Sequence, residues 1–111
     1  MGKQIMSERV YAPDKWVIIE ITNSKGESHR RVLGSWYGGF AGSDSWRASS
    51  GIESTTDEGD YWAVLNSSGS TYNCFKGCEG MSAYTMGVLD RMMRDAEEDG
   101  GKIEVVEMEN A

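Results

Sequence analysis

Segments that are rich in β-branched and aromatic residues, or that alternate apolar and polar positions, occupy the first two thirds of the chain, and a helical period follows. Residues 15–22 are rich in β-branched and aromatic side chains, and the turn-forming residues 23–26 come directly after them. This pattern predicts a strand and a tight turn that leads into a second strand at 27–37. By the same reasoning we expect strands at 45–55, 61–66 and 71–76.

Apolar residues recur at intervals of three and four from Ala83 to Ala96, which is typical of an amphipathic helix. Ser82 is a suitable N-cap, and Gly100 with Gly101 marks the end of the helix. Alternation resumes in a last predicted strand at 102–108. The helical stripe consists of Ala83, Met86, Leu89, Met93 and Ala96, with Val88 and Met92 beside it.

Five strands, one helix and a final strand predict an α+β fold of one domain spanning residues 1–111. The simplest arrangement is a mainly antiparallel sheet of five to six strands, with the helix (about 82–98) packed on one face. The helical connection is long enough to join parallel strands, so one parallel pair stays open. We expect residues 1–11 and the last few residues to fray.

The net charge of −7 is unevenly distributed along the chain. Residues 95–111 hold seven acidic side chains against a single lysine, whereas residues 25–50 carry a local charge of +2. The acidic region favours solubility, and a role in contacting a basic surface of a partner also stays open. Phosphate contacts dominate affinity for nucleic acids, so the acidic total disfavours nucleic acid as a partner.

No stretch of 18 apolar residues is present, and the N-terminal residues lack the apolar stretch of a secretory signal. We therefore expect a cytoplasmic protein without a membrane partner. His29, Cys74 and Cys78 are too few and too widely spaced for a typical zinc site, so we expect neither a metal nor a disulfide, with Cys74 in the core. A single histidine offers no catalytic pair or triad, and we expect no enzymatic activity and no cofactor.

Residues 34–51 combine large aromatic side chains with glycine and serine. Aromatic side chains supply contact area at a low conformational cost, while glycine and serine let a backbone approach a partner closely. The segment is therefore our candidate binding surface. We expect Trp36 and Trp46 to anchor it in the sheet, and Tyr37, Phe40 and Arg47 to meet a partner. Arg30 and Arg31 are further candidates, since guanidinium groups pair with phosphates and carboxylates.

Residues 34–47, together with 68–76 and 80–85, resemble small uncharacterised accessory proteins of tailed bacteriophages. The resemblance covers about half of the chain. It implies a non-structural protein made in an infected bacterium, of the kind that redirects host factors or neutralises defence.

Two functions follow as hypotheses. The first is a non-enzymatic protein that engages or inhibits a host protein through residues 34–51. The alternative is a small-ligand binder that sequesters a nucleotide-type anionic signal, with an arginine on the phosphate and an aromatic ring on the base. Exposed aromatic side chains or an open sheet edge would also permit homo-oligomers.

Overall fold

The computed structural model describes residues 9–38 and 44–108, and these form two four-stranded sheets and one α-helix. Sheet A has the strand order β1-β7-β6-β5, and sheet B has the order β4-β3-β2-β8. The elements in chain order are β1 (Val10–Tyr11), β2 (Lys15–Thr22), β3 (Ser28–Trp36), β4 (Ser45–Ala48), β5 (Ile52–Asp57), β6 (Tyr61–Asn66), β7 (Thr71–Phe75), the short 3₁₀ turn η3 (Lys76–Cys78), α1 (Ala83–Glu98) and β8 (Lys102–Val106).

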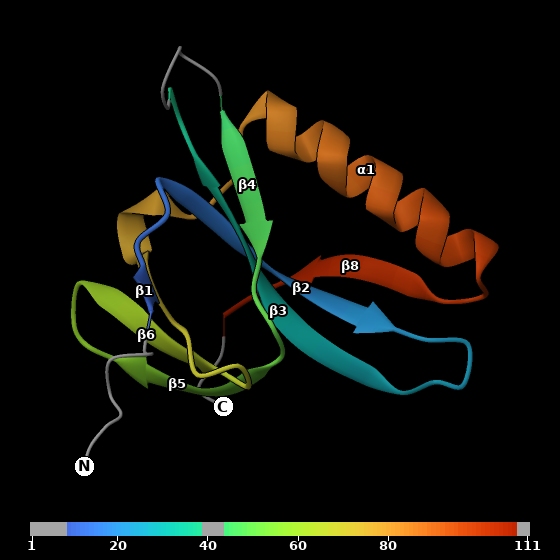
Figure 1. Cartoon of the computed structure of the whole chain (residues 1–111), viewed down its shortest axis with the longest axis horizontal. Coiled ribbons are helices and arrows are strands. Elements are labelled where there is room, and N and C mark those ends of the chain that lie inside the picture. Colours follow the sequence, from blue (N-terminus) through green and yellow to red (C-terminus); the bar gives the residue numbers. More distant parts are fainter. Residues whose placement is uncertain (1–8, 39–43, 109–111) are drawn as a thin grey trace.

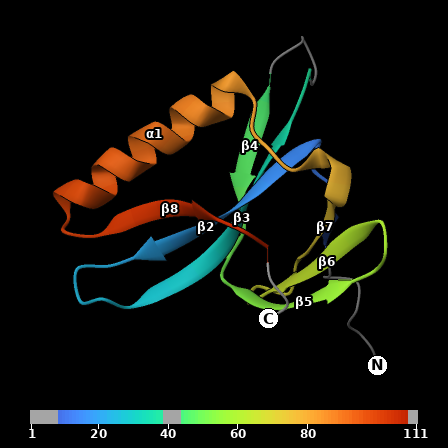
Figure 2. The same ribbon diagram turned by 180° about the vertical axis from the view of Figure 1, so that it is seen from behind.

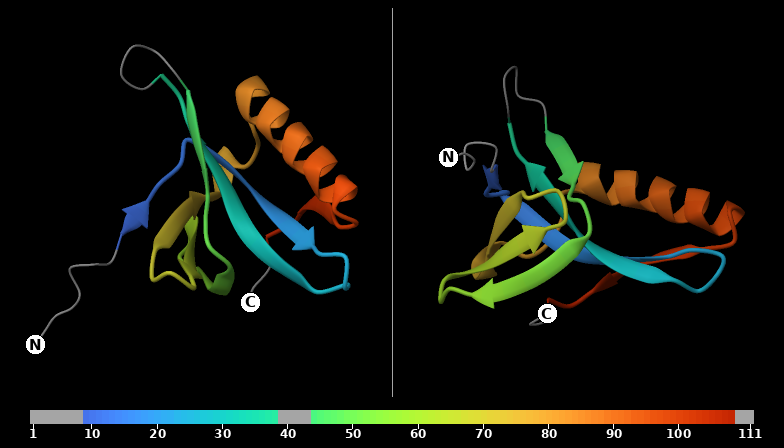
Figure 3. Two further views of the ribbon diagram at one scale, coloured as in Figure 1. Left: turned by 45° about the vertical axis from the view of Figure 1, so that its right-hand side comes forward. Right: turned by 60° about the horizontal axis from the view of Figure 1, so that its bottom comes forward.

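Sheet B is the middle layer of three, with sheet A on one face and α1 on the other (Figures 1 and 3). Strand β2 explains this arrangement, because four consecutive residues of it, from Trp16 to Ile19, are buried. Successive side chains of a strand point to opposite faces, so such a run needs cover on both sides. Trp16 and Ile18 pack against sheet A, and Val17 and Ile19 pack with Leu89 of α1.

The expected α+β class is confirmed, but the expectation of one sheet of five to six strands is wrong. The predicted strand at 45–55 breaks into β4, which belongs to sheet B, and β5, which belongs to sheet A. Buried Ser49 ends the pairing with β3: its N–H donates to the Val32 carbonyl, and its hydroxyl accepts from the Val32 N–H, both at 2.8 Å. The Ser67 N–H then donates to the Gly51 carbonyl at 2.8 Å, beside sheet A. A serine hydroxyl thus replaces a ladder partner where the chain changes sheets.

Helix α1 begins after Ser82, whose hydroxyl accepts from the Thr85 N–H as predicted for an N-cap. The buried stripe differs from the expected one at its start, since Thr85 is buried and Met86 is 55% exposed. Further along, Leu89, Met92 and Met93 pack on sheet B as expected. Neither α1 nor any other helix in the described ranges is long and apolar enough to cross a bilayer.

After α1 the chain returns to sheet B, where β8 pairs antiparallel with β2 (Figure 2). The helix therefore joins no parallel pair. The parallel pair lies instead between β1 and β7, where Val10 is opposite Thr71 and Tyr11 is opposite Tyr72. Residues 10 and 11, which we expected to fray, thus belong to sheet A, while residues 1–8 and 109–111 lie outside the described residues.

Candidate binding site

A cavity of about 270 Å³ opens beside the stem of the β3–β4 hairpin. Two adjacent strands of sheet B and one strand of sheet A contribute to it, so it forms only when the sheets pack together. We call it the aromatic pocket. Its lining consists of Tyr11, Trp36, Ser45, Trp46 and Arg47.

The register of β3 with β4 brings the pocket residues together. Trp36 is opposite Ser45, and Arg47 is opposite Gly34. Directly opposite residues share a face of a sheet, so Trp36 and Arg47 lie on the face toward sheet A. Gly34 leaves room there: a Cβ at this position would meet the Pro13 ring at 3.0 Å. A larger residue would thus displace the chain that leads from β1 into β2.

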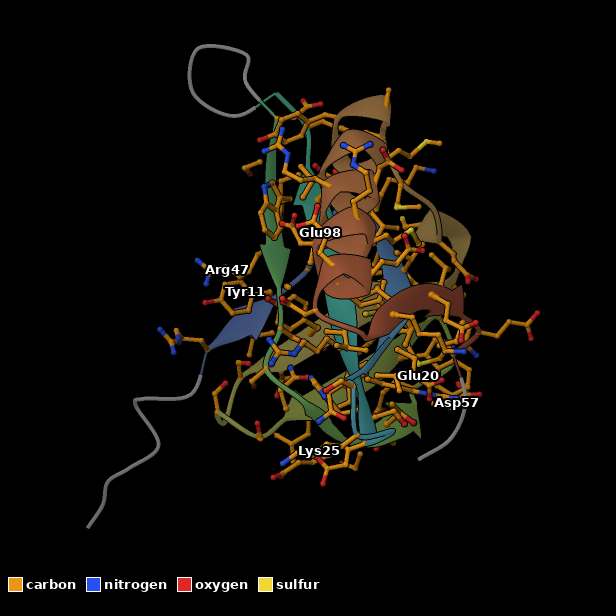
Figure 4. All side chains as sticks on the ribbon, turned by 90° about the vertical axis from the view of Figure 1, so that its right-hand side faces the viewer. Tyr11, Glu20, Lys25, Arg47, Asp57 and Glu98 are labelled. Carbon is orange, nitrogen blue, oxygen red and sulfur yellow. The ribbon has the colours of Figure 1, made fainter. Side chains whose placement is uncertain are left out.

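Tyr11 is the centre of the pocket. Its ring centroid lies 4.9 Å from that of buried Tyr72 and 6.3 Å from that of Trp36 in an edge-to-face arrangement. The guanidinium carbon of Arg47 lies 5.0 Å from the same centroid, which is a cation–π contact. Figure 4 shows Arg47 and Tyr11 side by side, the two side chains coming from different sheets.

Sequence reasoning missed Tyr11, because we expected residues 1–11 to fray. The available signal is the pattern from Val10 to Pro13, a β-branched residue and an aromatic one before a proline. Two residues are too few to establish a period, and the strand becomes recognisable only through its pairing with Thr71 and Tyr72.

The charge at the pocket is positive. Arg47 is exposed, and the described residues offer it no ion pair or hydrogen bond. Burial raises the pKa of Tyr72 to about 12, although the positive charges of Arg47 and Arg9 oppose that rise. Two guanidinium groups therefore lie near the aromatic cluster of an acidic protein, which favours a negatively charged ligand.

Two carboxylates near the hairpin stem, one before β2 and one before β4, accept hydrogen bonds from main-chain groups. Asp14 accepts a hydrogen bond from the Tyr37 N–H at 2.8 Å, and Asp44 accepts from the Gly38 N–H at 3.1 Å. The Asp14 bond ties the end of β3 to the residue before β2, and the Asp44 bond lies within the hairpin. Neither carboxylate forms an ion pair with the Arg47 guanidinium among the described residues.

The predicted site residues differ in burial and lie on different faces of sheet B. Trp36 is half-buried and packs against the core, as expected of an anchor, but Trp46 is 40% exposed, so the expectation that it anchors the segment is wrong. Within the described part of the chain β4 is an edge strand of sheet B, so no neighbouring strand shields its outer side, which accounts for this exposure. Tyr37 is exposed and continues β3 on the face toward α1, while Phe40 lies outside the described residues.

Arg30 and Arg31 lie elsewhere on β3. Arg30 is six residues from Trp36, about 20 Å along the strand, and forms an ion pair of 3.4 Å with Glu20. The Arg31 side chain donates to His29 Nε2 at 2.9 Å and to the Ser49 carbonyl at 3.4 Å. Of the three predicted arginines, only Arg47 lines the aromatic pocket.

A second cavity, of about 330 Å³, lies between the sheets near Trp16 and Trp62. Lys76, the positively charged residue in its lining, already has partners. Its Nζ lies 4.9 Å from the Trp62 ring centroid and 2.7 Å from Asp57 Oδ1. The hydrogen bonds from Lys76 and from the Gly59 N–H lower the pKa of Asp57. The second cavity thus holds a compensated ion pair, whereas the aromatic pocket holds a cation without one.

The potential metal ligands and the two thiols of the described residues form neither a metal-binding cluster nor a disulfide. Within 9–38 and 44–108, no group of three or more histidine, cysteine or acidic side chains is placed to hold a metal ion. Both cysteines are free, and burial raises the pKa of Cys74 to about 12, which keeps this core thiol protonated.

Comparison of this chain with protein-family models, with curated proteins and with solved structures gave no match.

Proposed function

We propose that this protein is a binding protein that captures a partner protein through the aromatic pocket and the adjacent hairpin. The observation that carries the proposal is the placement of Arg47 over Tyr11 in an open cavity. Binding sites of proteins are rich in tyrosine, tryptophan and arginine, which combine large contact area with directed hydrogen bonds.

The pocket favours a partner side chain that is planar or acidic. The rings of Tyr11 and Trp36 offer apolar walls, and the Arg47 guanidinium offers N–H donors at the rim. A carboxylate would accept two parallel hydrogen bonds from this guanidinium, the strongest arrangement available to either group. The exposed rings of Tyr37 and Trp46 lie on the other face of the hairpin stem, toward α1, and offer a second apolar surface there.

The resemblance to bacteriophage accessory proteins supports a bacterial host protein as the partner, in the cytoplasm of an infected cell. Inhibition of that protein, including a role against host defence, follows if the captured surface is a functional one. The acidic residues between 95 and 107 lie at the end of α1, in the turn after it, and along and just after β8. None of them lines the pocket, and they are available to contact a basic region of the same partner.

The experiment that tests the proposal captures partners from a bacterial lysate with tagged wild-type protein and with the double variant Tyr11→Ala/Arg47→Ala. The matched control is Arg94→Ala, which removes an exposed arginine of α1. A partner identified by mass spectrometry should be held by the wild type and by the control but lost by the double variant. Equal retention by all three proteins, each with an intact thermal transition, contradicts the proposal.

A second candidate is a small anionic ligand, because the aromatic pocket places a guanidinium group beside aromatic rings. At about 270 Å³ the pocket lies just below the usual range of roughly 300–1,000 Å³ for small-molecule sites, so only a small ligand fits. Such a ligand would place one planar ring in the pocket and an anionic group on Arg47. A thermal-shift panel of mono-, di- and cyclic nucleotides tests this reading, and the absence of any shift at saturating ligand rejects it.

A further inference from the structure

Strand β4 is the open edge of sheet B, and it is the most exposed strand of that sheet. Ser45, Trp46 and Arg47 are all exposed. An edge strand presents unpaired main-chain N–H and C=O groups, which are a template for a further strand.

The hydrogen-bond pattern identifies the groups on the open side. The Ser49 N–H donates to the Val32 carbonyl, so these opposite residues direct their main-chain groups toward each other. Bonded and non-bonded pairs alternate along an antiparallel ladder, which makes Arg47–Gly34 a bonded pair and Trp46–Ser35 a non-bonded one. Consistently, the Ser35 carbonyl points away from β4 and accepts from the Asp14 N–H at 2.9 Å. Trp46 therefore directs its N–H and C=O outward, beside its exposed indole.

The other edges carry features that discourage pairing. β1 has two residues, β5 has a register shift between Ile52 and Ser54, and β8 has exposed Lys102 and Glu104. Short strands, bulges and charges are the usual protection of edges. On β4 the single charged side chain, Arg47, lies over Tyr11 instead of along the edge.

Side-chain chemistry restricts what can pair with β4. A matching strand needs an apolar residue opposite Trp46, a small or acidic residue opposite Arg47 and a residue without negative charge opposite Asp44. A second β4 meets each requirement. With the two Trp46 residues opposite each other, Arg47 is opposite Ser45 and Asp44 is opposite Ala48 of the second copy.

We propose that β4 pairs antiparallel with β4 of a second copy of this chain about a two-fold axis at Trp46, which joins the two B sheets into one. The axis is perpendicular to the joined sheet, so equivalent faces stay on the same side. Both aromatic pockets then open on one side of the dimer, and the two indoles meet on the other. A dimer of this form presents two binding sites in a fixed relation to a partner.

Sedimentation velocity of the full chain over a range of concentrations tests the proposal. Wild-type protein and Trp46→Phe should reach twice the monomer mass of 12.3 kDa as concentration rises. Trp46→Pro removes only an outward N–H from the main chain, and Trp46→Lys places two like charges opposite each other while keeping that N–H. Each change should raise the dimer dissociation constant by about tenfold to a hundredfold, with the thermal transition retained.

The register is tested by mixing Ser45→Cys with Arg47→Cys, each in a Cys78→Ser background, under mild oxidation. The proposed pairing places these two positions opposite each other, so the mixed disulfide should exceed both homodimeric disulfides. A wild-type protein that stays monomeric overturns the proposal and leaves the edge for an extended segment of another protein. A dimer that persists in both Trp46→Pro and Trp46→Lys, or a mixture without the mixed disulfide, overturns it as well. Tyr11→Ala should still dimerise, which separates this inference from the proposed function.

Discussion

The Arg47 guanidinium lies 5.0 Å from the centroid of the Tyr11 ring, and this contact joins edge strand β4 of sheet B to edge strand β1 of sheet A. The arginine gains a fixed position without an ion pair among the described residues. A cation held by a ring keeps its N–H donors available, because the ring takes only the face of the guanidinium. This is why we place the proposed binding function here and not at Lys76, whose ammonium already bonds to Asp57.

The two tryptophans of the hairpin stem should differ in their contribution to stability. Trp36 packs against the core between the sheets, so Trp36→Ala should cost about 2–3 kcal/mol of unfolding free energy. Trp46 is 40% exposed, so Trp46→Ala should cost less than about 1 kcal/mol in the monomer. Urea denaturation at low protein concentration measures both, and equal losses would show that Trp46 is also an anchor.

Replacing Gly87 or Gly101 by alanine should change the stability of the protein in opposite directions. Gly87 lies in α1 with open space around it, so Gly87→Ala should stabilise the protein by about 0.5–1 kcal/mol through helix propensity. A Cβ at Gly101 would overlap the Thr22 carbonyl oxygen, so Gly101→Ala should destabilise by about 1–3 kcal/mol. Thermal unfolding of the two variants gives the sign directly. A stabilised Gly101→Ala protein would contradict the close approach of β8 to the β2–β3 turn.

Ser49 should contribute to folding stability, because it bonds to β3 at the point where the chain passes from sheet B to sheet A. In Ser49→Ala the buried Val32 N–H loses its acceptor, which should cost about 1–3 kcal/mol. Ser50→Ala is the control, because the Ser50 hydroxyl bonds to Ser68 in an exposed position and its loss should cost about 0.5 kcal/mol or less. Chemical denaturation compares the pair, and similar losses would argue against a special role of Ser49.

Stability should fall at alkaline pH because two buried groups resist ionisation. Burial raises the pKa of Cys74 from 9.0 to about 12 and that of Tyr72 from 10.0 to about 12. The unfolded chain ionises first, so the stabilisation is complete below pH 9 and is lost as the pH rises from 9 toward 12. Each group contributes up to about 1.4 kcal/mol per pH unit in its own range.

The variant Cys74→Ala isolates the thiol contribution. It should be less stable than the wild type at neutral pH, because a buried side chain is shortened, but it should lose stability less steeply above pH 9. Urea denaturation at several pH values gives both quantities. An unchanged slope would show that Cys74 ionises equally in the folded and unfolded states.

The two cysteines should also differ in accessibility. In native protein a thiol reagent should label Cys78 before the buried Cys74.

Most elements could be predicted from the sequence because their signals are local. The strand at 15–22 is indicated by its β-branched and aromatic residues, the strand at 61–66 by alternation, and the cap at Ser82 by its hydroxyl. Each of these signals lies within a few residues of the chain. The division into two sheets depends on contacts between distant residues. One local signal for it was available, since the unbroken apolar run from Trp16 to Ile19 requires cover on both faces of its strand.

The candidate site could be predicted only in part for the same reason. Composition identified Trp36, Trp46 and Arg47 as binding candidates, and these three line the aromatic pocket. Composition gave no indication of Tyr11, whose position follows from a parallel pairing with residues sixty places along the chain. Composition also suggested Arg30 as a site residue. In the structure Arg30 forms an ion pair with Glu20 of the adjacent strand, and this contact depends on the register of the β2–β3 hairpin, which composition does not reveal.

The measurement that tests the central claim most directly is the affinity of the captured partner for purified wild-type protein, Tyr11→Ala, Arg47→Ala and the double variant. Calorimetric titration should show a loss of about tenfold or more for each single variant, with a double variant less than additive, because the two side chains hold each other in place. Arg94→Ala should bind like the wild type. Unchanged affinity in the double variant would contradict the assignment of partner binding to the aromatic pocket.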